Sequence, residues 1–232
     1  MLSSYAKIEW VTITILSMML SGVLVFLGQG YWALLVLTLA AALLSFFRDP
    51  DRVMPTQRHV MVAPADGKVT SVHRIDHFEP FGEPVVCVRI FLSVFDVHIN
   101  RCPTHCVVKS IEHRRGRHRN ALKADSAEDN ESNLIVLAHP VRGEPIAAVR
   151  QVSGMIARTI VCGVREGQIL QRGERIGMIK LGSTTELYIS EKLSPQVQVQ
   201  TGQKVYGAVT VLANVMALGR NETADGSESS TN

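Results

Sequence analysis

The chain has few cysteines, little net charge and no hydrolase nucleophile motif. Four cysteines in 232 residues are too few for the disulfide framework of a small secreted scaffold, and they favour a reducing cytoplasmic location. The formal net charge is only +3, so total charge gives no argument for nucleic-acid binding. Gly-x-Ser-x-Gly, which marks the nucleophile of α/β-hydrolases, does not occur.

Two long apolar runs dominate the amino-terminal end. They cover residues 8–27 and 31–47, and each is about long enough to cross a hydrocarbon core of roughly 30 Å as a helix, the second at the short end. This predicts a helical hairpin, and the second run argues against a cleaved signal peptide. Lys7 precedes the hairpin and Arg48 and Arg52 follow it, so the positive-inside rule places both ends at the cytoplasmic face of the inner membrane. A hairpin that dips into one leaflet also fits.

The rest of the sequence predicts a mostly antiparallel β sandwich or barrel with some α structure. Short β-type runs broken by glycine and proline continue from residue 60 onward. They cover residues 60–63, 68–73, 85–92, 106–112, 134–138, 147–152, 175–181, 186–189 and 205–212. Residues 153–164 fit a helix or a strand. We therefore expect a membrane anchor at 1–52, a β-rich domain at 53–216 and a disordered tail at 217–232.

The Gly182-Ser183 peptide bond is a candidate for self-cleavage. A serine hydroxyl directly after glycine can attack the preceding carbonyl at little steric cost, because glycine has no side chain to block the approach. The product is an ester in place of an amide. Elimination of that ester would release Gly182 as a carboxyl terminus, and loss of ammonia would convert Ser183 into a pyruvoyl group. Gly-Ser is also a common loop dipeptide, so the context must decide.

That context resembles the phosphatidylserine decarboxylase proenzymes, in particular the short form of the family. The resemblance covers roughly residues 46–212, in the family's order and spacing. It is carried by Phe-Phe-Arg-Asp-Pro at 46–50, Ala-Pro-Ala-Asp-Gly-Lys-Val at 63–69, Asp-Val-His-Ile-Asn-Arg at 96–101, Asn-Glu at 130–131, and Gly-Glu-Arg-Ile-Gly-Met-Ile-Lys at 173–180 before the Gly-Ser bond.

The resemblance implies a pyruvoyl-dependent enzyme that decarboxylates phosphatidylserine to phosphatidylethanolamine. Autocatalytic serinolysis between Gly182 and Ser183 would yield a β chain, 1–182, and an α chain, 183–232, that stay together as a heterodimer. The pyruvoyl group on Ser183 would form a Schiff base with the substrate amine and accept the electrons left when CO2 departs. No metal or added cofactor is implied, and a higher homo-oligomer stays open.

The resemblance also indicates the residues that assist Ser183. His98 takes the place of the first family histidine and is the candidate for accepting the serine proton, while Asp66, if adjacent, would orient its imidazole. Arg101 stands where longer bacterial enzymes have a second histidine, and arginine cannot act as a base at ordinary pH. We expect either that His98 serves both steps or that Arg101 contacts the substrate. Asp66 as a turn residue and His98 as a core histidine are the structural alternatives.

A basic cluster at 113–119 is the strongest local concentration of charge. Arg114, Arg115 and Arg117 would face anionic lipid headgroups, each contributing about 1 kcal/mol near such a surface. A solvated hairpin loop explains the cluster equally well.

Cysteine and histidine also gather at 102–106, with Cys102, His105 and Cys106 close in sequence. Their spacing matches no standard zinc pattern, and alternation along a strand would point Cys102 and His105 to opposite faces. We expect no metal site here.

Two other classes of protein use the same features. A membrane-anchored serine hydrolase could employ Ser183, His98 and Asp66, and a membrane-anchored β module could act as an adaptor without catalysis. Both predict an intact chain, whereas self-cleavage predicts two fragments.

Overall fold

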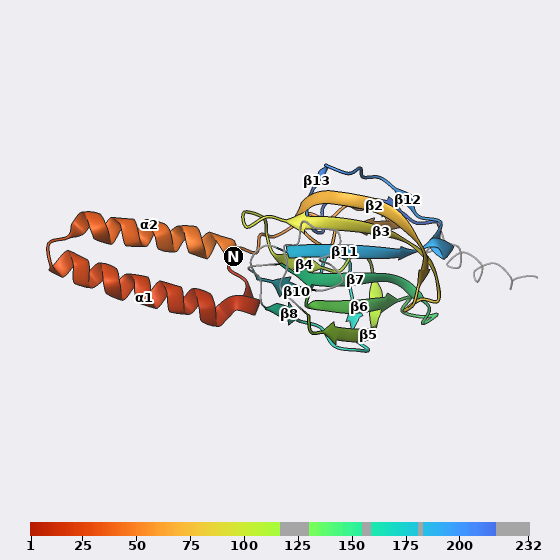
Figure 1. Ribbon diagram of the computed structural model, residues 1–232, viewed down its shortest axis with the longest axis horizontal. Coiled ribbons are helices and arrows are strands. Elements are labelled where there is room, and N and C mark those ends of the chain that lie inside the picture. Colours follow the sequence, from red (N-terminus) through yellow and green to blue (C-terminus); the bar gives the residue numbers. More distant parts are fainter. Residues whose placement is uncertain (117–129, 155–158, 181–182, 217–232) are drawn as a thin grey trace, which may run out of the picture.

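The computed structural model describes residues 1–116, 130–154, 159–180 and 183–216 of the chain. A helical hairpin projects from one end of a β-rich body (Figure 1). The hairpin region contains η1 (Ser4–Ala6), α1 (Lys7–Phe26) and α2 (Gly30–Phe46). The body contains β1 (Val60–Val62), β2 (Gly67–Phe78), β3 (Glu83–Leu92), β4 (Ile99–Arg101), β5 (Cys106–Arg114), β6 (Ser132–Ala138), β7 (Pro145–Ser153), β8 (Ile160–Cys162), β9 (Ile169–Leu170), β10 (Arg175–Ile179), β11 (Ser183–Ser190), η2 (Glu191–Leu193), β12 (Gln196–Val197), β13 (Lys204–Val205) and β14 (Val211–Asn214).

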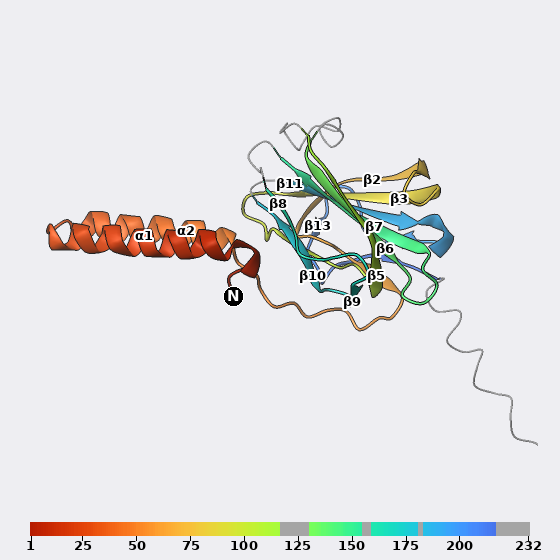
Figure 2. The same ribbon diagram turned by 90° about the horizontal axis from the view of Figure 1, so that it is seen from below.

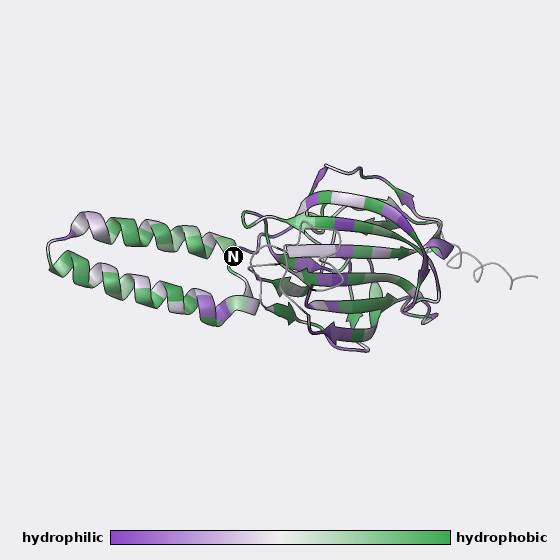
Figure 3. Ribbon diagram, viewed as in Figure 1, coloured by the Kyte–Doolittle hydropathy of each residue, from purple (hydrophilic) through white to green (hydrophobic). Residues whose placement is uncertain are grey.

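The two hairpin helices agree with the predicted runs to within one residue at each end. The chain reverses after α1 at Gly28, whose φ of 72° lies in the left-handed region that glycine adopts without strain. The apolar segment Ser4–Phe26 is long enough to cross a membrane, whereas α2 has 17 residues. Hydrophobic residues predominate along both hairpin helices (Figure 3). Large apolar side chains such as Leu16 and Leu34 are exposed there. Such a surface suits a lipid environment better than water.

The β-rich body is built from one large antiparallel sheet that curls over two small ones. The large sheet has the strand order β13-β2-β3-β11-β7-β6-β5-β9, and the small sheets have the orders β4-β10-β8 and β1-β14-β12. Figure 2 shows β10 and β9 across the body from β2 and β3. The predicted antiparallel, mostly β fold with a helical hairpin is confirmed.

The main core lies on the inner face of the large sheet. It includes Val88, Ile90, Ile135, Val149 and Leu187, all fully buried. Burial of such a side chain stabilises a fold by about 1.5–3 kcal/mol. All eight residues of the central strand β11 are buried, so this strand is covered on both faces.

Several strands differ from the predicted runs. Residues 205–212 form two strands joined by a turn, because the amide of Gly207 donates a hydrogen bond to Asp66 and Ala208 takes a φ of 63°. β11 begins three residues earlier than the predicted run at 186–189, and the short strands β4, β9 and β12 were not predicted. Residues 153–164 contain the end of β7 and all of β8, and positions 155–158 lie outside the described residues. The predicted tail, 217–232, lies outside them too.

Candidate active site

Ser183 is the first residue of β11 and lies between two neighbouring strands. Its Cα pairs with Leu92 of β3 on one side and Ser153 of β7 on the other. The Ser183 side chain is fully buried, and its Oγ has no hydrogen-bond partner among the described residues. An unsatisfied buried hydroxyl costs about 1–3 kcal/mol, so this arrangement needs a reason other than stability. Gly182 lies outside the described residues.

A buried polar network continues along the inner face from Ser183. Thr185 shares this face because side chains alternate along a strand, and its Oγ1 accepts a 2.8 Å hydrogen bond from Nδ2 of Asn100. The Asn100 Oδ1 accepts from Gln151, whose Oε1 accepts from Asn133 at 3.0 Å. All four side chains are buried. The sequence assigned no role to Asn100, Gln151 or Asn133. Asn100 lies in the motif at 96–101, but the three side chains come from separate strands and meet only in the folded chain.

His98 lies just before β4, and the network places it near Ser183. Asn100 and Thr185 are hydrogen-bonded to each other. His98 comes two residues before Asn100, and Ser183 comes two residues before Thr185, so the hydrogen bond holds their two segments together. In addition, the amide of Ile179 donates to the His98 carbonyl at 3.2 Å. Four residues of extended chain reach at most about 14 Å, so Ser183, four residues after Ile179, lies within roughly 17 Å of the His98 carbonyl. The structure therefore brings these two predicted residues to one end of the fold.

The environment of His98 keeps its imidazole neutral. The ring is buried against Phe46, with centroids 4.4 Å apart. Desolvation lowers the pKa of His98 to about 4, although the backbone hydrogen bond and charge of Asp96 oppose this shift. The Nδ1 atom lies 2.9 Å from the Asp96 main-chain carbonyl, which can only accept. Nδ1 therefore carries the proton, and Nε2 is the basic nitrogen.

The hydrogen bonds of Asp66 in the described part of the chain go to residues other than His98. Its Oδ1 accepts from the amide of Gly207 at 2.7 Å, and its Oδ2 accepts from Nη2 of Arg52 at 2.7 Å. The main-chain carbonyl of Asp96, rather than the carboxylate of Asp66, orients the imidazole in the described part of the chain. Asp66 instead joins the segment that follows the hairpin to the turn before β14.

Arg101 is buried and bound within the protein. Its Nη2 donates to Oδ1 of Asp49 at 2.6 Å and to the Pro50 carbonyl at 3.1 Å, and its Nη1 donates to the Gly173 carbonyl at 3.1 Å. These partners occupy the guanidinium that the sequence analysis considered for substrate contact. A substrate anion would have to displace the Asp49 carboxylate.

The basic cluster begins at the same end of the large sheet as Ser183. Arg114, the last residue of β5, pairs with Ser132, which pairs with Val152, which in turn pairs with Thr184. Arg114 and Arg115 are exposed. Arg117 lies outside the described residues.

The cysteines at 102 and 106 contact each other. Their sulfur atoms are 3.3 Å apart, both are buried, and Cys102 donates to the Thr104 carbonyl. The exposed His105 lies 3.0 Å from the Leu170 carbonyl through Nδ1. Within the described ranges, no group of three or more side chains could hold a metal ion.

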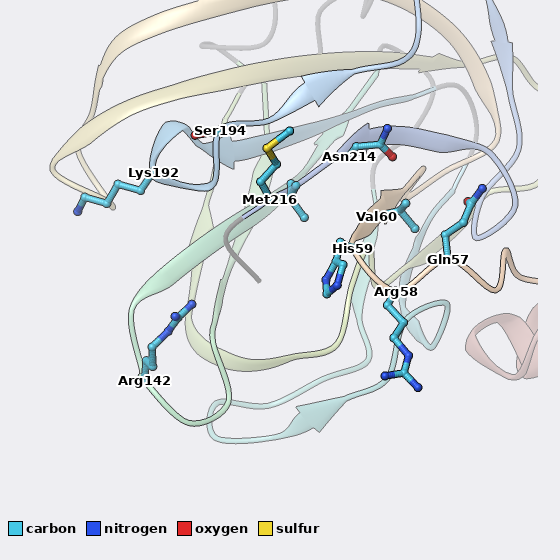
Figure 4. A pocket seen from close by; sticks show the side chains of 10 residues that line it. Gln57, Arg58, His59, Val60, Arg142, Lys192, Ser194, Asn214 and Met216 are labelled. Atoms are coloured by element: carbon cyan, nitrogen blue, oxygen red, sulfur yellow. The ribbon is translucent and has the colours of Figure 1, made fainter. Parts of the chain in front are cut away.

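A surface hollow of about 900 Å³ lies at the opposite end of β11. It is lined by Gln57, Arg58, His59, Val60, Arg142, Lys192, Ser194, Asn214, Val215 and Met216 (Figure 4). The seven steps from Ser183 to Ser190 span roughly 23 Å at about 3.3 Å per residue. The hollow therefore lies too far from Ser183 to be part of the same site.

Comparison with known proteins adds an independent line of evidence. The family model described as phosphatidylserine decarboxylase matches residues 39–213. A phosphatidylserine decarboxylase proenzyme of Carboxydothermus hydrogenoformans is 40% identical over 197 residues, which cover 84% of this chain and 91% of that protein. Proenzymes of the same name from Rhodopirellula baltica and Oleidesulfovibrio alaskensis are 41% and 42% identical, over 88% and 79% of this chain and 84% and 82% of their own lengths.

Proposed function

Because the chain belongs to the phosphatidylserine decarboxylase family, we propose that it decarboxylates phosphatidylserine to phosphatidylethanolamine and CO2 with a pyruvoyl group made from its own Ser183. The observation that carries this proposal is the Ser183 hydroxyl, buried and without a hydrogen-bond partner among the described residues. A buried serine of this kind is a suitable precursor for a pyruvoyl group, because that group has to react with the substrate in a site from which water is excluded. When formed, a pyruvoyl ketone captures the substrate amine and withdraws the electrons that remain after CO2 leaves.

The self-cleavage step uses groups that the site supplies. Nε2 of neutral His98 accepts the proton of Ser183 while Oγ attacks the Gly182 carbonyl. His98 then gives this proton to the Ser183 nitrogen as the C–N bond breaks, which leaves an ester and a free amine. Removal of the Ser183 α-proton then expels Gly182 as a carboxylate and leaves dehydroalanine. Tautomerisation and addition of one water release ammonia and leave the ketone. A pKa of about 4 keeps His98 in the basic form at neutral pH.

His98 also fits the proton transfers of the decarboxylation. An incoming substrate carboxylate beside the imidazole favours its charged form and raises its pKa. The imidazolium can then return a proton to the substrate carbon after CO2 has left. The Asp96 carbonyl holds Nδ1–H throughout, so the orientation of Nε2 does not change between steps.

The two chains that cleavage would produce share one sheet. β11, the first strand of the 183–232 fragment, pairs with β3 and β7 of the 1–182 fragment along its full length. All of its residues are buried. We therefore propose that the fragments remain a heterodimer, because release would expose this strand and two unpaired sheet edges.

The proposed location is the cytoplasmic face of the inner membrane, with 1–52 as anchor and 53–216 as catalytic domain. The hairpin supplies the apolar segment. Arg114 lies in register with Thr184, at the end of the large sheet that faces the hairpin (Figure 1). Anionic headgroups at that end would attract the exposed Arg114 and Arg115. The serine hydrolase alternative requires Asp66 at His98, whereas the described contacts of Asp66 are with Arg52 and Gly207.

Denaturing gels and intact-mass measurements test this function. The purified wild-type chain should separate into fragments of 182 and 50 residues, since 232 minus 182 is 50, the smaller with a blocked amino terminus. Ser183→Ala should leave a single chain without decarboxylase activity on phosphatidylserine vesicles, and Ser183→Cys should cleave slowly. Ser153→Ala is the matched control, because it removes an equally buried hydroxyl from the adjacent strand. An active preparation consisting of full-length chain would contradict the proposal.

A further inference from the structure

The base of the hairpin is packed onto the catalytic body. Tyr5, Ala6, Trp10, Phe46 and Phe47 form the hairpin-base cluster, which packs against Val97, Ile99, Val161 and Met178 of the body. The start of the chain closes the open end of the hairpin, because the Ser3 amide donates to the Phe47 carbonyl and the Asp49 amide donates to the Met1 carbonyl. An apolar contact of this kind holds the hairpin in a fixed position against the β-rich body. A hairpin that served only as a membrane tether would not need such a contact.

Polar contacts join the same two parts around the reaction site. Glu9 of α1 forms an ion pair with Lys180, two residues before Gly182. Asp49 accepts from Arg101 at the end of β4 and from Arg175 at the start of β10. Each of these body residues lies in a segment that leads to Ser183 or His98. The hairpin base therefore contacts the chain segments that carry the two candidate catalytic residues.

The most direct contact is between Phe46 and His98. Phe46 is the last residue of α2, and its ring lies over the imidazole with a centroid distance of 4.4 Å and an interplanar angle of 41°. Both side chains are buried. The charged groups near the imidazole are Asp96, which is paired with Lys204, and Arg48, which follows the hairpin. Phe46 thus shields from water the group that we assign to proton transfer.

We propose that Phe46 is a positioning residue for His98, so that the membrane hairpin forms part of the reaction site in addition to anchoring it. The inference rests on the proposed function of His98. The Phe46 ring fixes the plane of the imidazole from one side while the Asp96 carbonyl fixes Nδ1 from the other. A stable plane keeps Nε2 directed at one point, which proton transfer to or from a defined atom requires.

Histidine NMR on the uncleaved chain tests this without relying on activity. In a Ser183→Ala background in detergent micelles, the Cε1 signal of His98, assigned with His98→Gln, should titrate only near pH 4. Phe46→Leu should raise the midpoint by about one pH unit, because one face of the ring becomes accessible to water. Phe47→Leu is the matched control, since this neighbouring ring packs edge-on against Phe46 at 5.2 Å. A Phe46→Leu midpoint no higher than that of Phe47→Leu would overturn the proposal.

Activity measurements then separate this inference from the proposed function. In the cleavable background, Phe46→Leu should slow self-cleavage and decarboxylation and move the acid limb of the pH profile upward, while flotation with vesicles stays unchanged. Phe46→Tyr should restore both reactions, because it returns an aromatic ring to the same position. Normal cleavage and activity in His98→Gln would refute the role of His98, whereas the NMR midpoints would still decide whether Phe46 shields the ring. An unchanged pH profile in Phe46→Leu would refute the positioning role.

Discussion

Replacement of Asp49 by alanine should destabilise the protein strongly, because Asp49 neutralises a buried arginine. The Asp49 and Arg101 side chains are 6% and 8% exposed, and their atoms are 2.6 Å apart. Removal of one partner of a buried ion pair typically costs about 3–5 kcal/mol, since the other charge is left without compensation. Arg175, the second partner of Asp49, has a side chain that is 41% exposed and can turn to water. The expected loss therefore comes mainly from Arg101.

Equilibrium unfolding in urea measures this loss. The Ser183→Ala background keeps a single chain, and Trp10 in the hairpin-base cluster provides a fluorescence signal at the contact between hairpin and body. Asp49→Ala should lower the free energy of unfolding by about 3–5 kcal/mol. Asp49→Ala combined with Arg101→Met should lose less than the sum of the two single changes, because no buried charge remains unpaired.

An exposed ion pair supplies the control for Asp49. Glu144 and Arg142 are 50% and 33% exposed at 3.0 Å, so Glu144→Gln should change the free energy by no more than about 1 kcal/mol. If Asp49→Ala had an effect as small as that of Glu144→Gln, the buried charge of Arg101 would have another partner and the reasoning would be wrong.

Two further predictions concern packing and pH. Gly177→Ala should cost about 1–3 kcal/mol in thermal or urea unfolding, since a Cβ would lie 2.1 Å from the Val161 carbonyl oxygen and 2.9 Å from Nε2 of Gln151. Gly22→Ala, whose Cβ meets nothing within 4 Å, should cost nothing measurable. The folded-state pKa of His98, about 4, lies below its ordinary 6.5, so the unfolded chain binds more protons between these values. The contribution of neutral His98 to the free energy of unfolding should be fully present above about pH 6.5 and should fall by about 3 kcal/mol as the pH drops to 4. Urea midpoints measured across this range should show the fall in the wild-type protein but not in His98→Gln.

The sequence predicted those parts of the fold that depend on local pattern. Both helices follow from uninterrupted apolar runs, and most strands follow from short β-type runs that glycine and proline interrupt. The turn within 205–212 could not be found in this way, because the hydrogen bond that stabilises it comes from Asp66, 141 residues away. β4 has only three residues, which is too short for a periodic signal.

In the candidate site, too, local motifs could be recognised from the sequence, whereas contacts between distant residues could not. Ser183 and His98 could be proposed from the sequence because each belongs to a motif that is contiguous in the chain. The partners of Asp66 and Arg101 were not found, since both are held by residues of the segment that follows the hairpin, Arg52 and Asp49. Sequence shows which carboxylates and cations exist but not which of them meet. The sequence also does not show which polar residues are exposed. Thr184 and Glu186 occupy alternate positions of β11, as residues on a solvent-facing side would, yet both are buried.

The position of Ser183 along β11 restricts which substrates can reach it. The strand carries hydroxyl side chains at its hairpin end, Ser183 and Thr185, and apolar ones further on, Leu187 and Ile189. A phospholipid whose acyl chains stay in the bilayer presents its headgroup within the interfacial layer, which is only about 5–8 Å thick on each side. Such a headgroup could reach the Ser183 end of β11, which faces the hairpin (Figure 1), but not the hollow, which lies roughly 23 Å further along the strand. If the hairpin anchors the protein as proposed, a lipid held in the bilayer would therefore meet Ser183 and not the hollow.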